Sequence, residues 1–165
     1  LFHALLDRLY RVDMQDYSYV ELGNIISNNL KTKNQSIDDS VIVEVSSVCR
    51  GNARQAQAMA NQISSYLSSK KSNKLTSDGW KDIKSKLSIY PLGLSEIELN
   101  VIKILKEHGE VRLTNLSAKT NLTKDMLQKN VELYLMRNSL IEIRPTGRAL
   151  TKKGHDYHKE HLEKS

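Results

Sequence analysis

The chain has 165 residues, of which 39% are hydrophobic and 27% charged, and this length allows one large domain or two small ones. It contains no run of about 18 or more apolar residues and no charged-then-apolar leader, which excludes a membrane span and a secretory signal within this sequence. The single cysteine, Cys49, excludes an intramolecular disulfide and a cysteine-based zinc cluster and is typical of the reducing cytoplasm.

Positive charge is spread evenly over the chain. The formal net charge is +6, with 12 basic and 9 acidic side chains in residues 1–90 and 13 and 10 in residues 91–165, so each half carries +3. Lysine and arginine supply most non-specific affinity for nucleic acid by neutralising phosphates. The excess therefore favours a nucleic-acid partner only modestly, because many proteins carry such a balance for no functional reason.

The first half of the chain predicts a short strand and four helices. Residues 10–14 alternate between apolar and polar side chains, as a strand does. Four further stretches carry apolar residues at helical spacing: residues 19–31, 38–50, 52–68 and 76–87. Asp38 or Asp39 is expected to cap the second of these helices, and Thr76 or Ser77 the fourth. Arg50-Gly51 is predicted to end the second helix, since glycine is the natural residue just past a helix C-terminus. Four short helices in this length predict a compact helical domain.

The second half has a different pattern. Residues 90–94, with Pro91 and Gly93, interrupt the helices and are the best predicted domain boundary. The elements predicted after it are a helix from Ser95 to His108, an extended piece 111–113, a helix 116–120, a helix capped by Thr123, strands 140–144 and 148–151, and a short helix from Lys152. This order predicts a winged helix, which is a helix-turn-helix followed by a β-hairpin wing. Winged helices bind either DNA or protein, so the layout alone does not choose between them.

Several motifs, in order and at compatible spacing, resemble the C-terminal part of RuvB, the bacterial ATP-driven Holliday-junction branch-migration motor. Residues 5–9, LLDRL, resemble the segment that closes the AAA+ ATPase core. Residues 50–54, RGNAR, resemble the sensor-2 motif that opens the third lid helix. Residues 92–94, LGL, resemble the joint into the winged helix, Tyr134-Leu135 stands at the family's spacing from an arginine, and residues 145–148, PTGR, resemble the wing tip.

The resemblance implies a mainly α fold with three parts. Residues 1–16 would be a remnant of the AAA+ ATPase core, residues 17–90 a four-helix AAA+ lid, and residues 91–165 a winged-helix DNA-binding domain. It further implies a cytoplasmic protein that assembles as a hexameric ring and binds double-stranded or junction DNA. A junction-recognition protein is a further partner that the resemblance allows, and a membrane is not one.

Nucleotide chemistry would come mainly from outside this sequence. Neither a phosphate loop of the G-x-x-x-x-G-K-[ST] kind nor an acidic pair following an apolar strand occurs, so the chain alone is expected to bind no cofactor and not to hydrolyse ATP. The ATPase core of a longer parent, an ATP-dependent DNA helicase, would hold ATP and Mg²⁺. The resemblance implies that Arg54 senses the γ-phosphate and that Arg8 is an inter-subunit arginine finger, because a guanidinium offers a planar fork of donors. The alternative for Arg54 is an ordinary surface arginine. Arg50, in the same motif, could simply bond the last carbonyl groups of the preceding helix.

The wing is the predicted DNA contact. Arg144 and Arg148 flank a turn that Pro145 and Gly147 make rigid, so their cations could straddle a minor groove. The candidate DNA-binding residues are Arg144, Thr146, Gly147, Arg148, Lys152 and Lys153. The third helix of this domain carries side chains of both signs, so sequence-specific reading is not expected from it. Contacts to the phosphate backbone carry little base information, which suits a motor that moves along any sequence.

Departures from the family indicate a divergent relative. Leu6 and Thr146 stand where the family usually has basic residues, and Asn52-Ala53 replaces Thr-Pro. Two other functions stay open: a different AAA+ initiator or loader, or a non-enzymatic winged-helix regulator or protein-docking module. A metal site is not expected, because the three histidines at positions 155, 158 and 161 would need further ligands to converge on one ion.

Overall fold

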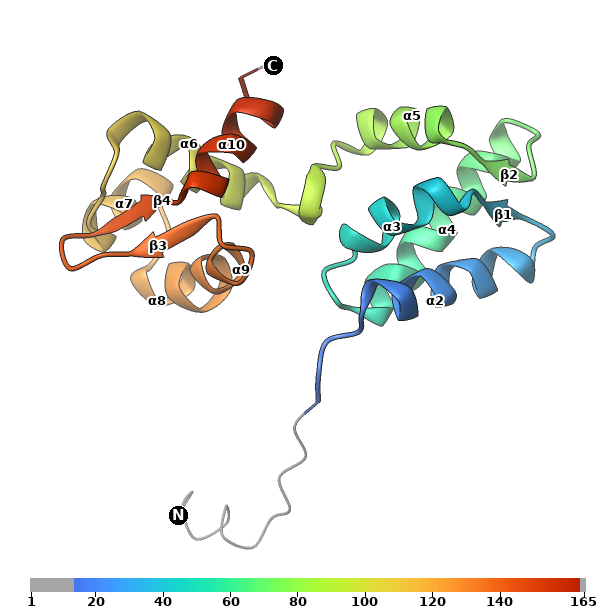
Figure 1. Ribbon diagram of the computed structural model, residues 1–165, viewed down its shortest axis with the longest axis horizontal. Coiled ribbons are helices and arrows are strands. Elements are labelled where there is room, and N and C mark those ends of the chain that lie inside the picture. The colour runs from blue at the N-terminus through green and yellow to red at the C-terminus, as the bar shows by residue number, and fades with distance from the viewer. Residues whose placement is uncertain (1–13, 164–165) are drawn as a thin grey trace, which may run out of the picture. The chain divides into compact units, whose positions relative to one another are not determined.

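A computed structural model describes residues 14–163 and divides into two compact units, one ending at Ser85 and the other beginning at Lys86 (Figure 1). The predicted strand at residues 10–14 lies outside the described residues except for Met14, which is in neither a helix nor a strand. The chain is mainly helical, as predicted.

The four helices predicted in the first unit are present, and two of them are capped by residues that the sequence predicted. They are α2 (Tyr19–Lys31), α3 (Asp39–Ser47), α4 (Ala53–Ser69) and α5 (Ser77–Leu87). Asp38 caps α3, and the Thr76 hydroxyl accepts from the backbone N–H of Gly79 at the start of α5. Their apolar stripes meet in a core that includes the fully buried side chains of Leu22, Ile26 and Trp80. Burial of these stripes, and not intrinsic helix propensity, accounts for the stability of such short helices.

A two-residue parallel pairing was not predicted. Strand β1 (Ser36–Ile37) pairs with β2 (Lys74–Leu75), with Ile37 opposite Leu75. Both of those side chains are buried, and Lys74 reaches the Asp38 carboxylate at 3.3 Å. Hydrogen bonds from Ser40, and then the neighbouring Lys74, lower the pKa of Asp38. A strand of two residues is too short to show period-two alternation, so only the tertiary contact identifies it.

The predicted end of the second helix is wrong. Helix α3 ends at Ser47, with Val48 as its C-cap, and Arg50 and Gly51 then adopt positive φ values of 55° and 73°. A Cβ atom on Gly51 would lie 2.6 Å from the Cβ of Asp16, so glycine is required there by close packing as well as by its φ. The glycine therefore shapes the turn between α3 and α4 and is not the residue that directly follows the helix.

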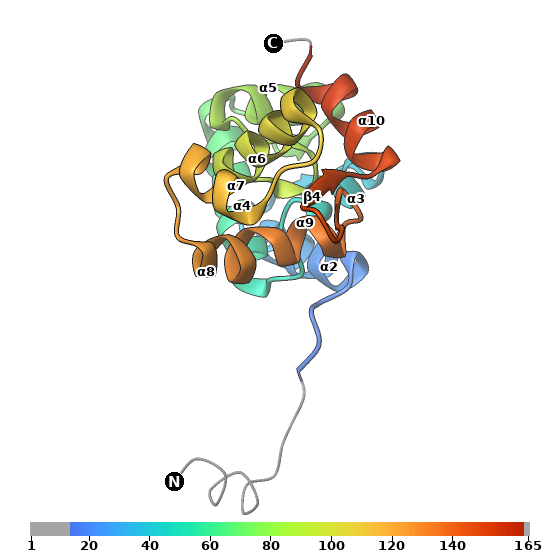
Figure 2. The same cartoon turned by 90° about the vertical axis from the view of Figure 1, so that its left-hand side faces the viewer.

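The second unit contains the elements of a winged helix, as predicted (Figure 2). They are η1 (Pro91–Gly93), α6 (Glu96–His108), α7 (Leu113–Thr120), α8 (Lys124–Met126), η2 (Leu127–Glu132), α9 (Leu133–Arg137), β3 (Ile141–Ile143), β4 (Arg148–Leu150) and α10 (Lys152–His161). Segments α8, η2 and α9 form one continuous helix whose middle is π-helical. The extended piece predicted at 111–113 is shorter than expected, since Leu113 already begins α7 and only Val111 pairs, with Arg148.

Two tyrosines hold the η1 segment against the second unit. The Tyr134 hydroxyl donates to the carbonyl of Leu92 at 2.6 Å, and the Tyr157 hydroxyl donates to the carbonyl of Pro91 at 2.9 Å. Burial raises the pKa of Tyr157, so its phenol stays protonated and remains a donor at neutral pH. The residues at the predicted boundary are therefore attached to the winged helix.

The wing rests on a buried ion pair. Strands β3 and β4 pair antiparallel, and Val111 exchanges backbone hydrogen bonds with Arg148 at 2.9 and 2.8 Å. The Arg148 side chain, 12% exposed, places Nε and Nη2 at 2.7 and 3.2 Å from the two carboxylate oxygens of Glu132, which is 1% exposed. Such a two-point contact fixes the base of the wing against the π-helical segment.

The first testable prediction concerns this ion pair. Arg148→Met should lower the free energy of unfolding by about 3–5 kcal/mol, because it leaves the buried Glu132 carboxylate without a partner. The double variant Arg148→Met with Glu132→Leu should recover most of that loss, since both charges are then gone. Urea unfolding of each variant checks this, and a single variant as stable as the parent would contradict it.

A second prediction concerns the packing of α10. A Cβ atom on Gly154 would collide with the carbonyl oxygen of Leu140, so the helix can dock there only with glycine. Gly154→Ala should therefore cost about 1–3 kcal/mol of stability, the usual penalty of overpacking. Thermal unfolding measures the loss, with the exposed neighbour Lys153→Ala as the control that should change little.

Candidate nucleic-acid interface

The predicted wing contact Arg144 is exposed but already faces two carboxylates. Its Nε and Nη2 lie 2.8 and 2.5 Å from one oxygen of Glu142, and its Nη1 lies 3.8 Å from Glu110. The side chain is 49% exposed. Arg144 is therefore accessible to a phosphate only through the edge that Glu110 faces.

Glu110 also contacts the tip of the wing turn, and a backbone hydrogen bond closes the turn. The hydroxyl of Thr146 donates a hydrogen bond to Glu110, and the backbone N–H of Arg144 donates to the carbonyl of Gly147 at 2.7 Å. Gly147 is buried, and a Cβ atom there would lie 2.6 Å from the carbonyl oxygen of Val111. Thr146 is exposed at the tip, whereas Gly147 acts by allowing the close approach of the chain.

The sequence pattern predicts that Arg148 and Arg144 are two free cations on the wing, but the Arg148 side chain is not free. On β4 it lies opposite Ile143 and bridges to Val111, and its guanidinium is taken up by the buried Glu132. A side chain 12% exposed cannot reach a phosphate without breaking that ion pair. The geometry therefore gives Arg148 a positioning role.

Other cations around the wing are free of carboxylates. Lys152 and Lys153 are exposed in the first turn of α10, and neither forms an ion pair with any residue in 14–163. Arg112, which the sequence analysis did not single out, is exposed just before α7. It lines a cleft of about 290 Å³ together with Leu113 and residues 144–148. Only the tertiary contact of Val111 with β4 places Arg112 beside the wing, so sequence order gave no signal for it.

The helix that reads DNA in other helix-turn-helix proteins is mixed in charge here. Lys124, Gln128 and Asn130 are exposed, and Lys129 is paired with Asp125 at 2.7 Å across one helical turn. Both side chains stay 70% exposed, so the pairing places an anion directly beside this surface cation. The observed face is consistent with the expectation of little sequence-specific reading.

The predicted nucleotide sensor lies at a helix start in the first unit. The Asn52 side chain caps α4 by accepting from the backbone N–H groups of Arg54, at 2.8 Å, and Gln55, at 3.4 Å. The Arg54 side chain is exposed. The backbone N–H of Tyr17 donates to the carbonyl of Gly51 at 3.0 Å, so the half-exposed ring of Tyr17 lies near the same turn. Arg8, the predicted arginine finger, lies outside the described residues.

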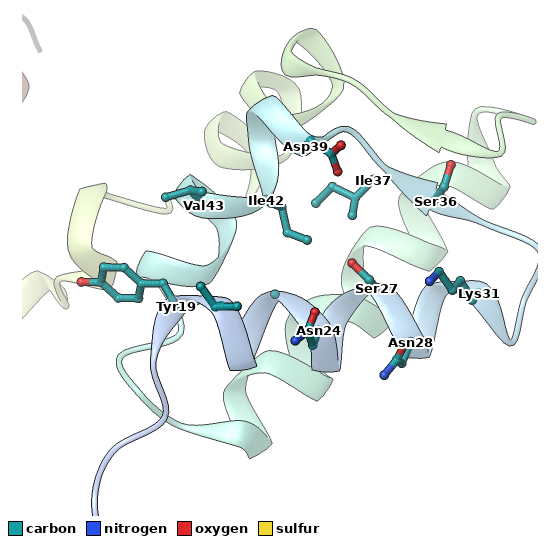
Figure 3. Close-up of a pocket in the computed structure, with 12 residues that line it drawn as sticks. Tyr19, Asn24, Ser27, Asn28, Lys31, Ser36, Ile37, Asp39, Ile42 and Val43 are labelled. Carbon is teal, nitrogen blue, oxygen red and sulfur yellow. The ribbon is translucent and has the colours of Figure 1, made fainter.

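A separate groove of about 630 Å³ runs between α2, β1 and α3 in the first unit (Figure 3). Figure 3 shows Tyr19 and Lys31 along α2, and Asp39 and Val43 on α3 across from them. Tyr19 and Val43 are 48% and 61% exposed, so much of the rim is apolar. Lys31 and Asp39 contribute opposite charges, so the groove has no excess of positive charge to attract DNA.

Other chemistries find little support in the described part of the chain. No group of three or more histidine, cysteine, aspartate or glutamate side chains among residues 14–163 is arranged to hold a metal ion. Burial raises the pKa of the Cys49 thiol to about 11, so it is protonated and unreactive at neutral pH. Within the same residues, each helix is too short or too polar to cross a membrane.

The comparisons of the sequence with known proteins all find similarity to RuvB. Residues 91–159 match the family model described as RuvB C-terminal winged helix domain. The Holliday junction branch migration complex subunit RuvB of Pseudothermotoga lettingae is 31% identical over 143 residues, which cover 85% of this chain and 42% of that protein. The RuvB subunit of Wolbachia sp. subsp. Brugia malayi is 28% identical over 145 residues, covering 87% of this chain and 44% of that protein.

The fold agrees with a solved structure as well. The Thermotoga maritima RuvB Holliday junction branch migration motor matches with a TM-score of 0.75 and 24% identity over 88% of this chain and 50% of that chain. The chain thus spans about half, or less, of the length of these relatives. The chain is similar to RuvB over most of its length, and its residues 91–159 match the RuvB C-terminal winged helix domain.

Proposed function

We propose that the chain is the lid and winged-helix portion of an ATP-dependent DNA-translocating motor similar to RuvB. The observation that carries the proposal is the RuvB-type winged helix at residues 91–159, whose wing and following helix present exposed cations. In this proposal residues 17–90 are the lid, residues 91–165 hold DNA, and residues 1–16 belong to the end of an ATPase core. The intact protein would be a cytoplasmic hexameric ring acting on double-stranded or junction DNA, with a junction-recognition protein as a further partner.

DNA would be held through its phosphate backbone. Arg144 at the wing tip and Lys152 and Lys153 after β4 are exposed cations, and Thr146 adds a hydroxyl at the tip. Arg148 and Gly147 would act indirectly, by fixing the wing on the helix beneath it. Backbone contacts of this kind allow movement along any sequence, because they carry no base information.

Nucleotide would be sensed from the first unit. The exposed guanidinium of Arg54, at the start of α4, would reach the γ-phosphate of ATP held with Mg²⁺ by an ATPase core in the longer protein. Arg8 would serve as an arginine finger toward a neighbouring subunit. A change of nucleotide would then rotate the lid and carry the winged helix with it. A different AAA+ initiator or loader would share this arrangement, and the sequence of the core would separate the two.

A protein-docking module is the second candidate, and exposed apolar side chains favour it. Met126, Leu133 and Ile143 in the second unit are 45%, 54% and 52% exposed. Carboxylates also face the wing-tip arginine, which weakens its attraction for phosphate. This candidate is a non-enzymatic regulator, and it would show selective protein binding and no effect of nucleotide.

A salt titration of DNA binding tests the leading proposal. The chain should bind four-way junction and random duplex DNA, and three charge-removing changes together should weaken binding at least about tenfold at low salt. Each lost phosphate contact should also reduce the slope of log K against log salt by about 0.9. The three changes are Arg144→Gln, Lys152→Gln and Lys153→Gln.

A matched variant controls for net charge. Lys103, Lys119 and Lys159 are exposed lysines elsewhere in the second unit, and replacing all three by glutamine removes the same charge. That control should weaken binding much less. Equal losses in both variants would show that the wing is not the contact, and no binding by the parent chain at low salt would favour the docking module.

The Arg54 assignment is tested in a longer protein that carries the ATPase core. Arg54→Ala should lower the steady-state ATPase rate at least about tenfold, because it removes a donor aimed at the transferring phosphate. Lys70→Ala, at the other end of α4, is the control and should leave the rate unchanged. An Arg54→Ala protein as active as the parent would end the sensor assignment.

A further inference from the structure

The cleft beside the wing brings two arginines from distant parts of the chain together. It has a volume of about 290 Å³, and its lining includes Arg112, from the segment before α7, and Arg144, from the wing turn. Both side chains are exposed, and Arg112 forms no ion pair with any residue in 14–163. Two accessible cations on one cleft are suited to an anion.

Backbone pairing fixes the two walls of this cleft. Val111 and Arg148 exchange two backbone hydrogen bonds, and the chain at Gly147 approaches Val111 too closely to admit a side chain. Val111 is buried, whereas its two neighbours Glu110 and Arg112 are exposed. Because alternate residues of an extended segment point to the same face, Glu110 and Arg112 both lie beside the wing turn.

The Glu110 carboxylate occupies the wing tip as an anion would. One oxygen accepts the hydrogen bond of the Thr146 hydroxyl, and the other lies 3.8 Å from Nη1 of Arg144. The opposite edge of that guanidinium, Nε and Nη2, is bound to Glu142. Glu110 therefore covers the one edge of Arg144 that a phosphate could otherwise take.

We propose that this cleft binds one phosphodiester group of DNA through Arg112 and Arg144, and that the Glu110 carboxylate stands in for the phosphate until DNA displaces it. The inference rests on the proposed DNA-binding function and adds to it a new contact, Arg112, and a residue that tunes affinity, Glu110. Displacement is feasible because an exposed ion pair at 3.8 Å is weak and screened by salt. Glu110 would thus keep the affinity for DNA low enough for the DNA to be released.

The experiment measures duplex DNA binding by the whole chain at several salt concentrations. Glu110→Gln should raise affinity about two- to fivefold at low salt, the range that an exposed ion pair is worth. Arg112→Gln should lower affinity and reduce the salt slope by about 0.9, the value for one phosphate contact. Thermal unfolding of both variants should match the parent, which separates these effects from a loss of fold.

Two comparisons isolate the mechanism from net charge. Glu107→Gln makes the same charge change on the exposed end of α6 and should raise affinity less than Glu110→Gln does. The gain from Glu110→Gln should also disappear when Arg144 is replaced by glutamine, because the carboxylate acts through that arginine. A gain no larger than the control's, or one that survives without Arg144, would overturn the role of Glu110.

The remaining outcomes separate this inference from the proposed function. If Arg112→Gln binds DNA with unchanged affinity and salt slope, the cleft is not a phosphate site even though the chain binds DNA. If the parent does not bind and Glu110→Gln does, the carboxylate masks the site completely and the inference holds. If neither binds at low salt, the DNA-binding function itself fails, and the inference fails with it.

Discussion

The ion pair between Arg148 and Glu132 fixes the position of the wing on the second unit. A guanidinium that is largely buried can be stable there only beside a carboxylate, and Glu132 supplies one from the π-helical segment beneath the wing. The backbone of the same arginine bonds Val111, so one residue connects the wing, the helix and the segment before α7. The wing is consequently a fixed part of the domain rather than a loosely attached hairpin.

Because the wing is fixed in this way, some of its cations are paired with carboxylates and others stay exposed. Arg148 is committed to the interior, and Arg144 faces the carboxylates of Glu142 and Glu110. Around the wing, the exposed cations that form no ion pair within residues 14–163 include Arg112 on one side and the two lysines after β4. Acidic groups therefore lie directly beside the wing-tip arginine and lower the positive electrostatic potential there.

In the first unit, a left-handed turn and a helix cap position Arg54. Gly51 and Arg50 adopt left-handed conformations that turn the chain from α3 into α4, and Asn52 caps the new helix. Arg54 then projects from the first turn of α4 with its side chain in solvent. A positively charged residue at a helix N-terminus is mildly unfavourable for stability, and under the proposed function this arginine would meet a phosphate in a longer protein.

The sequence by itself determined the helices, their caps and the β-hairpin, because apolar periodicity and capping residues such as Ser95 and Thr123 act over a few neighbouring positions. It also indicated the family, through the spacing of motifs along the chain. The tertiary structure alone decided which cations are free. Arg112 and Glu110 are more than thirty residues from the wing turn, so no local pattern places them there. Whether an arginine meets phosphate or a buried carboxylate depends on which distant side chain packs beside it.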